Sequence, residues 1–167
     1  MAARRPPGDP AIRPARPGEA GALTALVLRS KAHWGYGPDF MARVRPLLTV
    51  TPEMVAKRPV VVLEDGALVA GLYALSEVDD GPADDDGATA ELDLLFVDPG
   101  HLGRGHGARL FAHASAAARA AGAARLVVES DPNAVGFYER MGMARTGGRA
   151  SPVEAGRVLP LLALDLG

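Results

Sequence analysis

Hydrophobic side chains follow a helical spacing in the first third of the chain. Apolar residues recur every three or four positions from Ala22 to Val27 and again from Phe40 to Leu48. Each stretch predicts an amphipathic helix, the first beginning near Pro17 and the second capped by Asp39. The sequence Thr51-Pro52-Glu53 predicts the start of one more helical turn.

Short β-branched and apolar runs in the rest of the chain predict strands. Val60 to Glu64 and Ala67 to Ser76 flank an Asp-Gly pair, an arrangement that predicts a hairpin. Helices are expected from the glycine-rich turn to Ala121, and from Asn133 to Met141. Further strands are expected at residues 11–13, 89–97, 126–129, 144–147 and 158–165. This order predicts a mixed α/β domain of the α+β type with one central sheet.

Composition narrows the class of protein. The 167 residues suffice for one domain with a buried core, expected at 10–167 after a disordered tail at 1–9. A net charge of −2 without a long basic run argues against nucleic-acid binding. The absence of cysteine excludes disulfides and thiolate catalysis in this chain. Four scattered histidines predict no metal site, and the lack of a signal peptide or an apolar span predicts a cytoplasmic protein.

Three alternating glycines, Gly103, Gly105 and Gly107, stand between a predicted strand and a predicted helix. Without Cβ atoms their backbone can approach a ligand closely, and the helix directs unpaired N–H groups toward it. The combination predicts a phosphate or diphosphate site. The run also fits the dinucleotide pattern GxGxxA. Glu129 follows it at about the sequence distance where that pattern has an acidic residue. Against a dinucleotide fold, five residues separate the strand from the turn, and too few βα units follow.

Two segments around this turn resemble the GNAT superfamily of acyl-CoA-dependent N-acetyltransferases. The first runs from Leu94 through Asp98-Pro99 to Phe111, and the second is Asn133 to Gly142. The resemblance implies a central, mostly antiparallel twisted sheet of about six to seven strands flanked by about four helices. It also implies acetyl-CoA as cosubstrate, an amine acceptor, no metal and the homodimers common in the family. The stretch Ser30 to Gly37 is similar to a bacterial subgroup.

The resemblance implies cofactor contacts along the strand, the turn and the second segment. The residues concerned are Leu95, Phe96, Val97, Leu102, Gly103, Arg104, Gly105, His106, Gly107, Ala108, Asn133, Phe137 and Tyr138. The family pattern has Gln or Arg at the position of Leu102, so the chain departs from it there. Arg104, two residues later, is the candidate to supply the missing cation.

Acyl transfer to an amine needs a base for the amine and an acid for the leaving thiolate. Tyr138 matches the family tyrosine that fills the acid role. Glu91 is the first candidate for the base, followed by Asp93 and Glu129; each of these carboxylates is alternatively a partner for an arginine or lysine. Strict alternation puts Glu91 and Asp93 on one face with Leu95, whereas a bulge, usual in the family, shifts that phase. Because the chain has no cysteine, direct attack in a ternary complex is the expected mechanism.

The acceptor site is expected between the two N-terminal helices. The resemblance places His33, Trp34 and Tyr36 over it, either as a flexible aromatic lid or as a small satellite core, with Glu129 as a further substrate residue. The acidic run 79–86 is expected to be a solvated loop or to attract a cationic amine. His106 and His113 are expected at the surface or the cleft rim. The sequence is compatible with a small molecule, an amino acid or a protein terminus as the acceptor. A non-catalytic acyl-CoA-binding module and nucleotide-dependent redox chemistry are the alternative functions.

Overall fold

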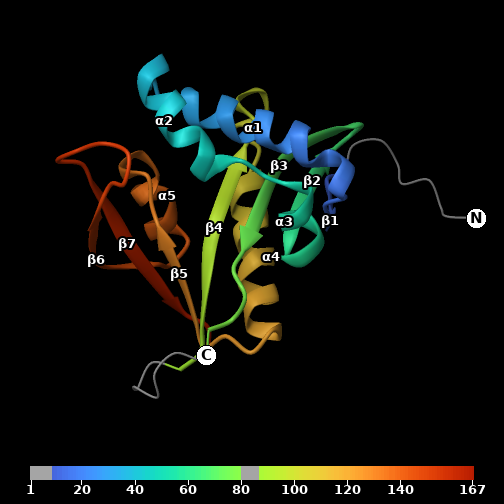
Figure 1. The fold of residues 1–167 in the computed structure, drawn as a ribbon. Helices are drawn as coiled ribbons and strands as arrows, with labels where there is room; N and C mark the ends of the chain where they lie inside the picture. The colour runs from blue at the N-terminus through green and yellow to red at the C-terminus, as the bar shows by residue number, and fades with distance from the viewer. Residues whose placement is uncertain (1–8, 80–86) are drawn as a thin grey trace, which may run out of the picture.

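The computed structural model describes residues 9–79 and 87–167 (Figure 1). The predictions for residues 1–8 and for most of the acidic run, at 80–86, lie outside the described residues. The elements follow the expected order: β1 (Ala11–Pro14), η1 (Pro17–Glu19), α1 (Ala20–Ala32), α2 (Pro38–Leu48), α3 (Pro52–Lys57), β2 (Val60–Asp65), β3 (Leu68–Leu75), β4 (Thr89–Val97), η2 (Pro99–His101), α4 (His106–Ala120), β5 (Arg125–Glu129), η3 (Pro132–Ala134), α5 (Val135–Arg140), β6 (Ala144–Ala150) and β7 (Val158–Asp165).

Two of the helix boundaries differ from the sequence prediction for identifiable reasons. Asp39 does not cap α2, because Pro38 is already its first residue and Gly37 is the N-cap. The fixed φ of proline suits this first position. The expected helix from Asn133 is divided into η3 and α5, and Asp131 caps the first of these by accepting a hydrogen bond from the Asn133 backbone N–H.

The seven strands form one sheet in the order β1-β2-β3-β4-β5-β7-β6. Neighbouring strands are antiparallel except β4 and β5, which run parallel. These two pair only from Thr89 to Glu91 on β4, after which they diverge (Figure 1). The later part of β4 pairs with β3 alone and leaves its other edge open. The expected mixed fold with a mostly antiparallel sheet is confirmed.

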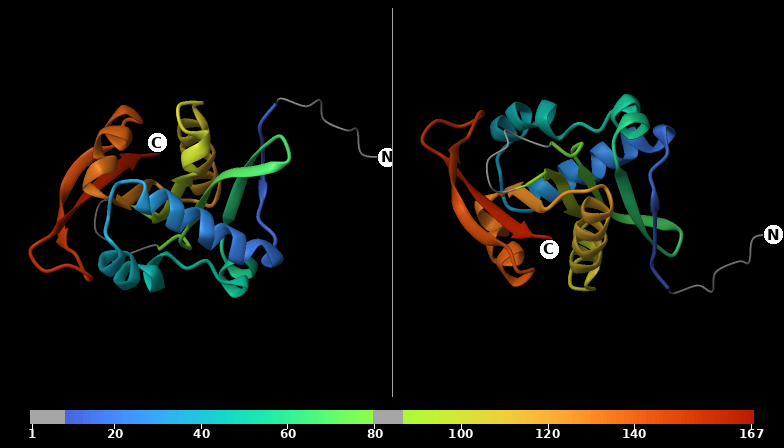
Figure 2. Two further views of the ribbon diagram at one scale, coloured as in Figure 1. Left: turned by 90° about the horizontal axis from the view of Figure 1, so that it is seen from above. Right: turned by 90° about the horizontal axis from the view of Figure 1, so that it is seen from below.

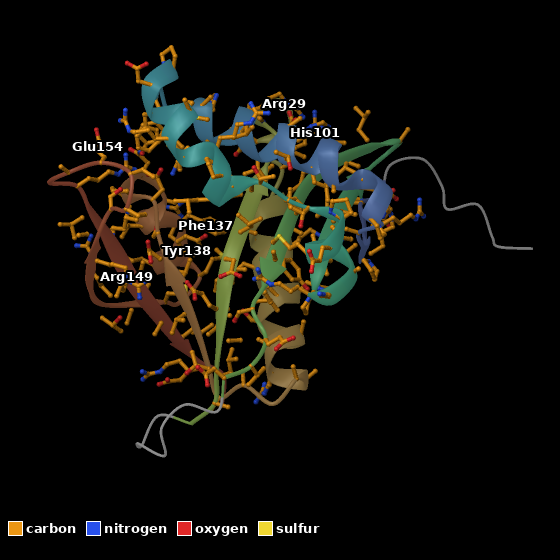
Figure 3. All side chains as sticks on the ribbon, viewed as in Figure 1. Arg29, His101, Phe137, Tyr138, Arg149 and Glu154 are labelled. Atoms are coloured by element: carbon orange, nitrogen blue, oxygen red, sulfur yellow. The ribbon has the colours of Figure 1, made fainter. Side chains whose placement is uncertain are left out.

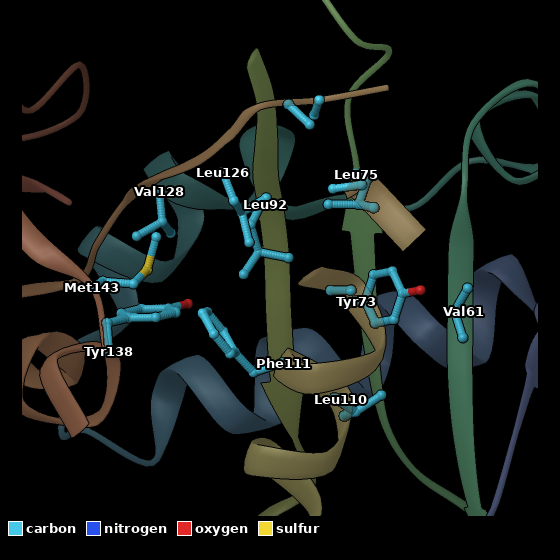
Figure 4. Close-up of a cluster of buried hydrophobic side chains, with 14 of the residues drawn as sticks. Val61, Tyr73, Leu75, Leu92, Leu110, Phe111, Leu126, Val128, Tyr138 and Met143 are labelled. Carbon is cyan, nitrogen blue, oxygen red and sulfur yellow. The ribbon is translucent and has the colours of Figure 1, made fainter. Parts of the chain in front are cut away.

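Helices cover both faces of the sheet, and each face has its own core. Figure 2 shows α1 and α4 on opposite sides of the strands. Leu23, Leu26 and Val27 of α1 pack against one face, together with Val62 and Leu72. The other face carries the side chains of α4 and α5, and Figure 4 shows this second core. Burial of apolar surface on both faces is the main favourable contribution to folding.

A bulge in β4 changes which side chains face each core. Leu92 is the register partner of Leu75 and Leu94 that of Ala74, so Asp93 is an extra residue between them. Leu92 therefore packs in the core beside α4, whereas Leu94 packs in the core beside α1. Strict alternation along β4 is wrong, and the alternative of a bulge is confirmed. Its consequence is that Glu91 no longer shares a face with Leu95.

Candidate active site

A cavity of about 1120 Å³ opens where β4 and β5 diverge. Its walls are β4, the β4–α4 turn, the ends of α1 and α2, the start of α5 and the segment between β6 and β7. Sixteen of the nineteen predicted site residues line it, whereas Arg104, His33 and Tyr36 do not. The lining residues among them are Trp34, Glu91, Asp93, Leu95, Phe96, Val97, Leu102, Gly103, Gly105, His106, Gly107, Ala108, Glu129, Asn133, Phe137 and Tyr138.

The glycine turn has the geometry that a diphosphate site requires. Gly103 and Gly105 have φ values of 76° and 77°, in the left-handed region that favours glycine. A Cβ built on either would meet no atom within 4 Å, so the space above the turn is open. Gly105 is the N-cap of α4, and no side chain caps the helix there. The first N–H groups of α4 are thus available to an anion such as a phosphate group.

Arg104 points away from this space. Its Nη1 lies 3.0 Å from Oδ2 of Asp65, in the turn region of the β2–β3 hairpin. His106 Nε2 contacts the same Oδ2 at 3.0 Å. The hydrogen bond from His106, followed by that from Arg104, holds the pKa of Asp65 below its usual range. Of the two positions expected for His106, the surface or the cleft rim, the surface is wrong, because its side chain is 3% exposed; the residue lines the cavity. Leu102 is half-exposed and faces the cavity.

The three candidate bases differ in their partners. Asp93, in the bulge, forms a salt bridge with Arg58. Glu129 Oε2 accepts a hydrogen bond of 2.9 Å from Nη1 of Arg149. The backbone N–H of Glu91 donates to Ser76 Oγ, whereas the Glu91 carboxylate has no ion pair with another described residue. Two of the three carboxylates are therefore arginine partners, as the alternative interpretation of the sequence predicted.

Tyr138 lies beside the cavity within an aromatic cluster, and its side chain is almost fully buried. Its ring centroid is 6.2 Å from that of Phe111 and 5.2 Å from that of Phe137. Figure 3 places Phe137 and Tyr138 between α5 and β4, and Figure 4 shows the Tyr138 hydroxyl directed toward β4. Burial, followed by the negative charge of Asp131, raises the pKa of Tyr138 well above its ordinary value. The phenol therefore holds its proton at neutral pH.

Sequence reasoning missed a polar cluster at the end of α1. Lys31 Nζ lies 2.6 Å from Asp131 Oδ2, which also accepts from the Tyr36 hydroxyl at 2.8 Å. Arg157 Nη2 donates to the Tyr36 hydroxyl at 2.5 Å. The Tyr36 ring stacks on Phe40 at 4.3 Å, so these two rings form a packed cluster rather than a flexible lid. The one sequence signal was a lysine among apolar positions at the end of a predicted helix.

Two further observations bear on the class of protein. No group of three or more His, Asp or Glu side chains among residues 9–79 and 87–167 is arranged to hold a metal ion. Over the same residues, no helix is long and apolar enough to cross a membrane.

Comparisons with known proteins agree with the fold and the turn. The chain is 41% identical over 73 residues to the peptidyl-lysine N-acetyltransferase YjaB of Salmonella typhimurium, a match that covers 44% of this chain and 48% of that relative. A GCN5-related N-acetyltransferase structure from Rhodopseudomonas palustris has a TM-score of 0.71 at 19% identity, covering 97% of this chain and 99% of that one. An acetyl-CoA complex of a GNAT family acetyltransferase from Brucella melitensis has a TM-score of 0.63 at 24% identity. The match covers 96% of this chain and 90% of that chain. The acetyltransferase (GNAT) family model matches residues 29–143, so the chain belongs to the GNAT acetyltransferase family.

Proposed function

We propose that the protein transfers an acetyl group from acetyl-CoA to a primary amine by direct attack in a ternary complex. The observation that carries this proposal is the divergence of β4 from β5 beside the open glycine turn. One cavity is thereby lined by the glycine turn, the open edge of β4, the buried Tyr138 and Glu91, whose carboxylate has no ion pair with another described residue.

In the proposed complex acetyl-CoA lies along β4. The diphosphate binds the N–H groups of the turn at the start of α4, and the pantetheine amides pair with the open edge at Leu95 and Val97. Such pairing depends on main-chain groups, so it tolerates Leu102 at the position where the family has a cation. Support comes from the related Brucella melitensis structure, which is a complex with acetyl-CoA.

In the proposed reaction the amine nitrogen attacks the thioester carbonyl carbon. The C–N bond forms, the C–S bond breaks, and the CoA thiolate takes the proton of the Tyr138 hydroxyl. The excess proton of the amine passes to Glu91, directly or through water. We favour Glu91 over Asp93 and Glu129 because each of those two carboxylates is neutralised by an arginine.

Initial-rate kinetics and ligand protection test the proposal. A ternary complex predicts intersecting double-reciprocal lines when acetyl-CoA and an amine are varied, whereas parallel lines would contradict direct attack. Acetyl-CoA and CoA are expected to raise the thermal unfolding midpoint, because they bind the folded state. Protection by NAD(H) without protection by CoA would favour the dinucleotide alternative instead.

A further inference from the structure

The buried cluster at the end of α1 contains more positive than negative charge. The side chains of Lys31, Asp131 and Arg157 are 10%, 11% and 13% exposed. One carboxylate thus lies between two cations, with Oδ2 2.6 Å from Lys31 Nζ and 3.4 Å from Arg157 Nη2. Among residues 9–79 and 87–167, Glu154 is the remaining acidic side chain paired with these cations, but it is 45% exposed and 3.5 Å from Arg157 Nη1. An uncompensated buried charge is costly, so the cluster favours a further anion.

Both cations retain hydrogen-bond donors for such an anion. The ammonium of Lys31 has three N–H groups, and Asp131 is its hydrogen-bond acceptor among the described residues. Arg157 has five N–H groups, of which Tyr36, Asp131 and Glu154 accept three bonds. Carboxylate and phosphate groups are the anions that arginine and lysine recognise with charge-assisted hydrogen bonds.

The cluster belongs to the acceptor part of the cavity. Lys31 and Arg157 line the same cavity as Glu91 and Tyr138. They come from the end of α1 and the segment before β7, whereas the glycine turn that we assign to the diphosphate precedes α4. The rings of Tyr36 and Phe40 hold both cations in place. Arg157 Cζ lies 4.7 Å from the centroid of the Tyr36 ring, and Lys31 Nζ lies 5.1 Å from the same centroid. A pre-positioned pair of cations suits a carboxylate carried by the acceptor.

We infer that the acceptor is an amine that also bears a carboxylate, as in an amino acid, and that Lys31 and Arg157 bind this carboxylate. The inference rests on the proposed acetyl transfer and names the substrate class of the same site. Part of the cavity wall is apolar, because the half-exposed Trp34 and Leu47 both line the cavity. An apolar group of the acceptor that packs against this wall removes apolar surface of both the acceptor and the wall from water.

Matched pairs of acceptors test the inference on the wild-type protein. Each pair is an α-, β- or γ-amino acid and its carboxamide, which has nearly the same shape without the charge. The acid is expected to have a kcat/KM about tenfold or more above that of its amide, the effect of a charge-assisted hydrogen bond. A kcat/KM for the amides that equals or exceeds that of the matching acids overturns the inference. Acetylation of a lysine peptide, with no acetylation of any amino acid, overturns it as well.

A binding measurement separates this inference from the proposed function. With the protein saturated by unreactive CoA, calorimetry is expected to show about tenfold tighter binding of the acid than of its amide. If no amine is acetylated but this difference persists, the proposed function fails and the carboxylate site stands. If amines are acetylated and both affinities are equal, the carboxylate site fails and the proposed function stands.

Variants identify the side chains that bind the carboxylate. Arg157→Gln and Lys31→Gln are expected to bring the acid-to-amide ratio of kcat/KM close to one, whereas Arg157→Lys retains part of it. The control is Arg145→Gln, an exposed arginine of β6 that does not line the cavity. An unchanged ratio in Arg157→Gln, or an effect confined to the KM of acetyl-CoA, overturns the assignment. Since Arg157→Lys keeps the charge, it tests the site even if the glutamine variants fold poorly.

Discussion

Lys31 and Asp131, separated by 100 residues in the sequence, form a buried salt bridge of 2.6 Å. It connects the last turn of α1 to the residue that caps η3. Both residues line the cavity between β4 and β5, so one contact joins the two segments that border the candidate active site. The salt bridge therefore couples the stability of this region to the geometry of the site.

The first prediction concerns the stability that this carboxylate provides. Asp131→Asn leaves two nearly buried cations without their carboxylate, so the free energy of unfolding is expected to fall by about 3 kcal/mol. Denaturant unfolding at pH 7 measures the change. The control is Lys57→Met, which removes an exposed i,i+4 pair with Glu53 and is expected to change the free energy by about 0.5 kcal/mol or less.

The loss of stability in Asp131→Asn is expected to depend on pH. Burial acts to raise the pKa of Asp131, but the hydrogen bonds from Lys31 and the Asn133 backbone outweigh it, and the pKa lies below its usual range. A carboxyl group whose folded pKa is lowered contributes stability that is fully present above its unfolded pKa of about 3.9. That contribution is lost as the pH falls through the folded pKa. The stability difference between wild type and Asp131→Asn should shrink below about pH 4; a constant difference would contradict this assignment.

The second prediction concerns the proposed general acid. Tyr138→Phe keeps the aromatic packing but removes the proton donor, so kcat is expected to fall about 100-fold. The dissociation constant of acetyl-CoA should stay within about twofold, because the lost group acts on the leaving thiolate. Since burial raises the pKa of Tyr138, the wild-type kcat should not decline with pH until above about pH 10. Tyr73→Phe, in the same core but bound to His113, is the control.

The third prediction separates the two carboxylates of β4. Glu91→Gln is expected to remove the acidic limb of the pH profile of kcat/KM, because the variant lacks the carboxylate that accepts the proton of the amine. Asp93→Asn is expected to retain that limb and to lower stability instead, since Arg58 loses its carboxylate partner. An acidic limb that survives in Glu91→Gln and disappears in Asp93→Asn would assign the base to the bulge residue.

The fourth prediction concerns the turn. Gly105 has a φ of 77°, so Gly105→Ala is expected to cost about 1 kcal/mol of stability or to shift the turn. Either response displaces the N–H groups at the start of α4, and the dissociation constant of acetyl-CoA should rise. Gly147→Ala is the matched control, because it lies on β6 where a Cβ meets no atom within 4 Å. Equal CoA affinity in wild type and Gly105→Ala would argue against a diphosphate at this turn.

Local signals explain the parts of the structure that were predictable. The Asp-Gly hairpin and the turn at the alternating glycines each depend on a few adjacent residues, and each appears where expected. The position of Tyr138 at the cavity followed from a family motif of ten residues, Asn133 to Gly142.

The remaining features depend on contacts between distant segments. The cluster of Lys31, Asp131 and Arg157 joins α1, the β5–η3 connection and the segment before β7, and its one sequence signal is the lysine at the end of the first predicted helix. The hairpin carboxylate Asp65 turns Arg104 away from the cavity, and it also contacts the buried His106, which was expected at the surface or the cleft rim. A tertiary ion pair thus outweighed what the turn sequence indicated.

The most direct test of acetyl transfer is the stoichiometry of products. Acetyl-CoA is incubated with the panel of amino acids, carboxamides and a lysine peptide, and both free CoA thiol and N-acetyl amide are measured by mass spectrometry. The proposed function predicts one amide for each thiol released, with both strongly reduced in Tyr138→Phe and retained in Tyr73→Phe. Saturable binding of acetyl-CoA without thiol release, or thiol release without any amide, would contradict it.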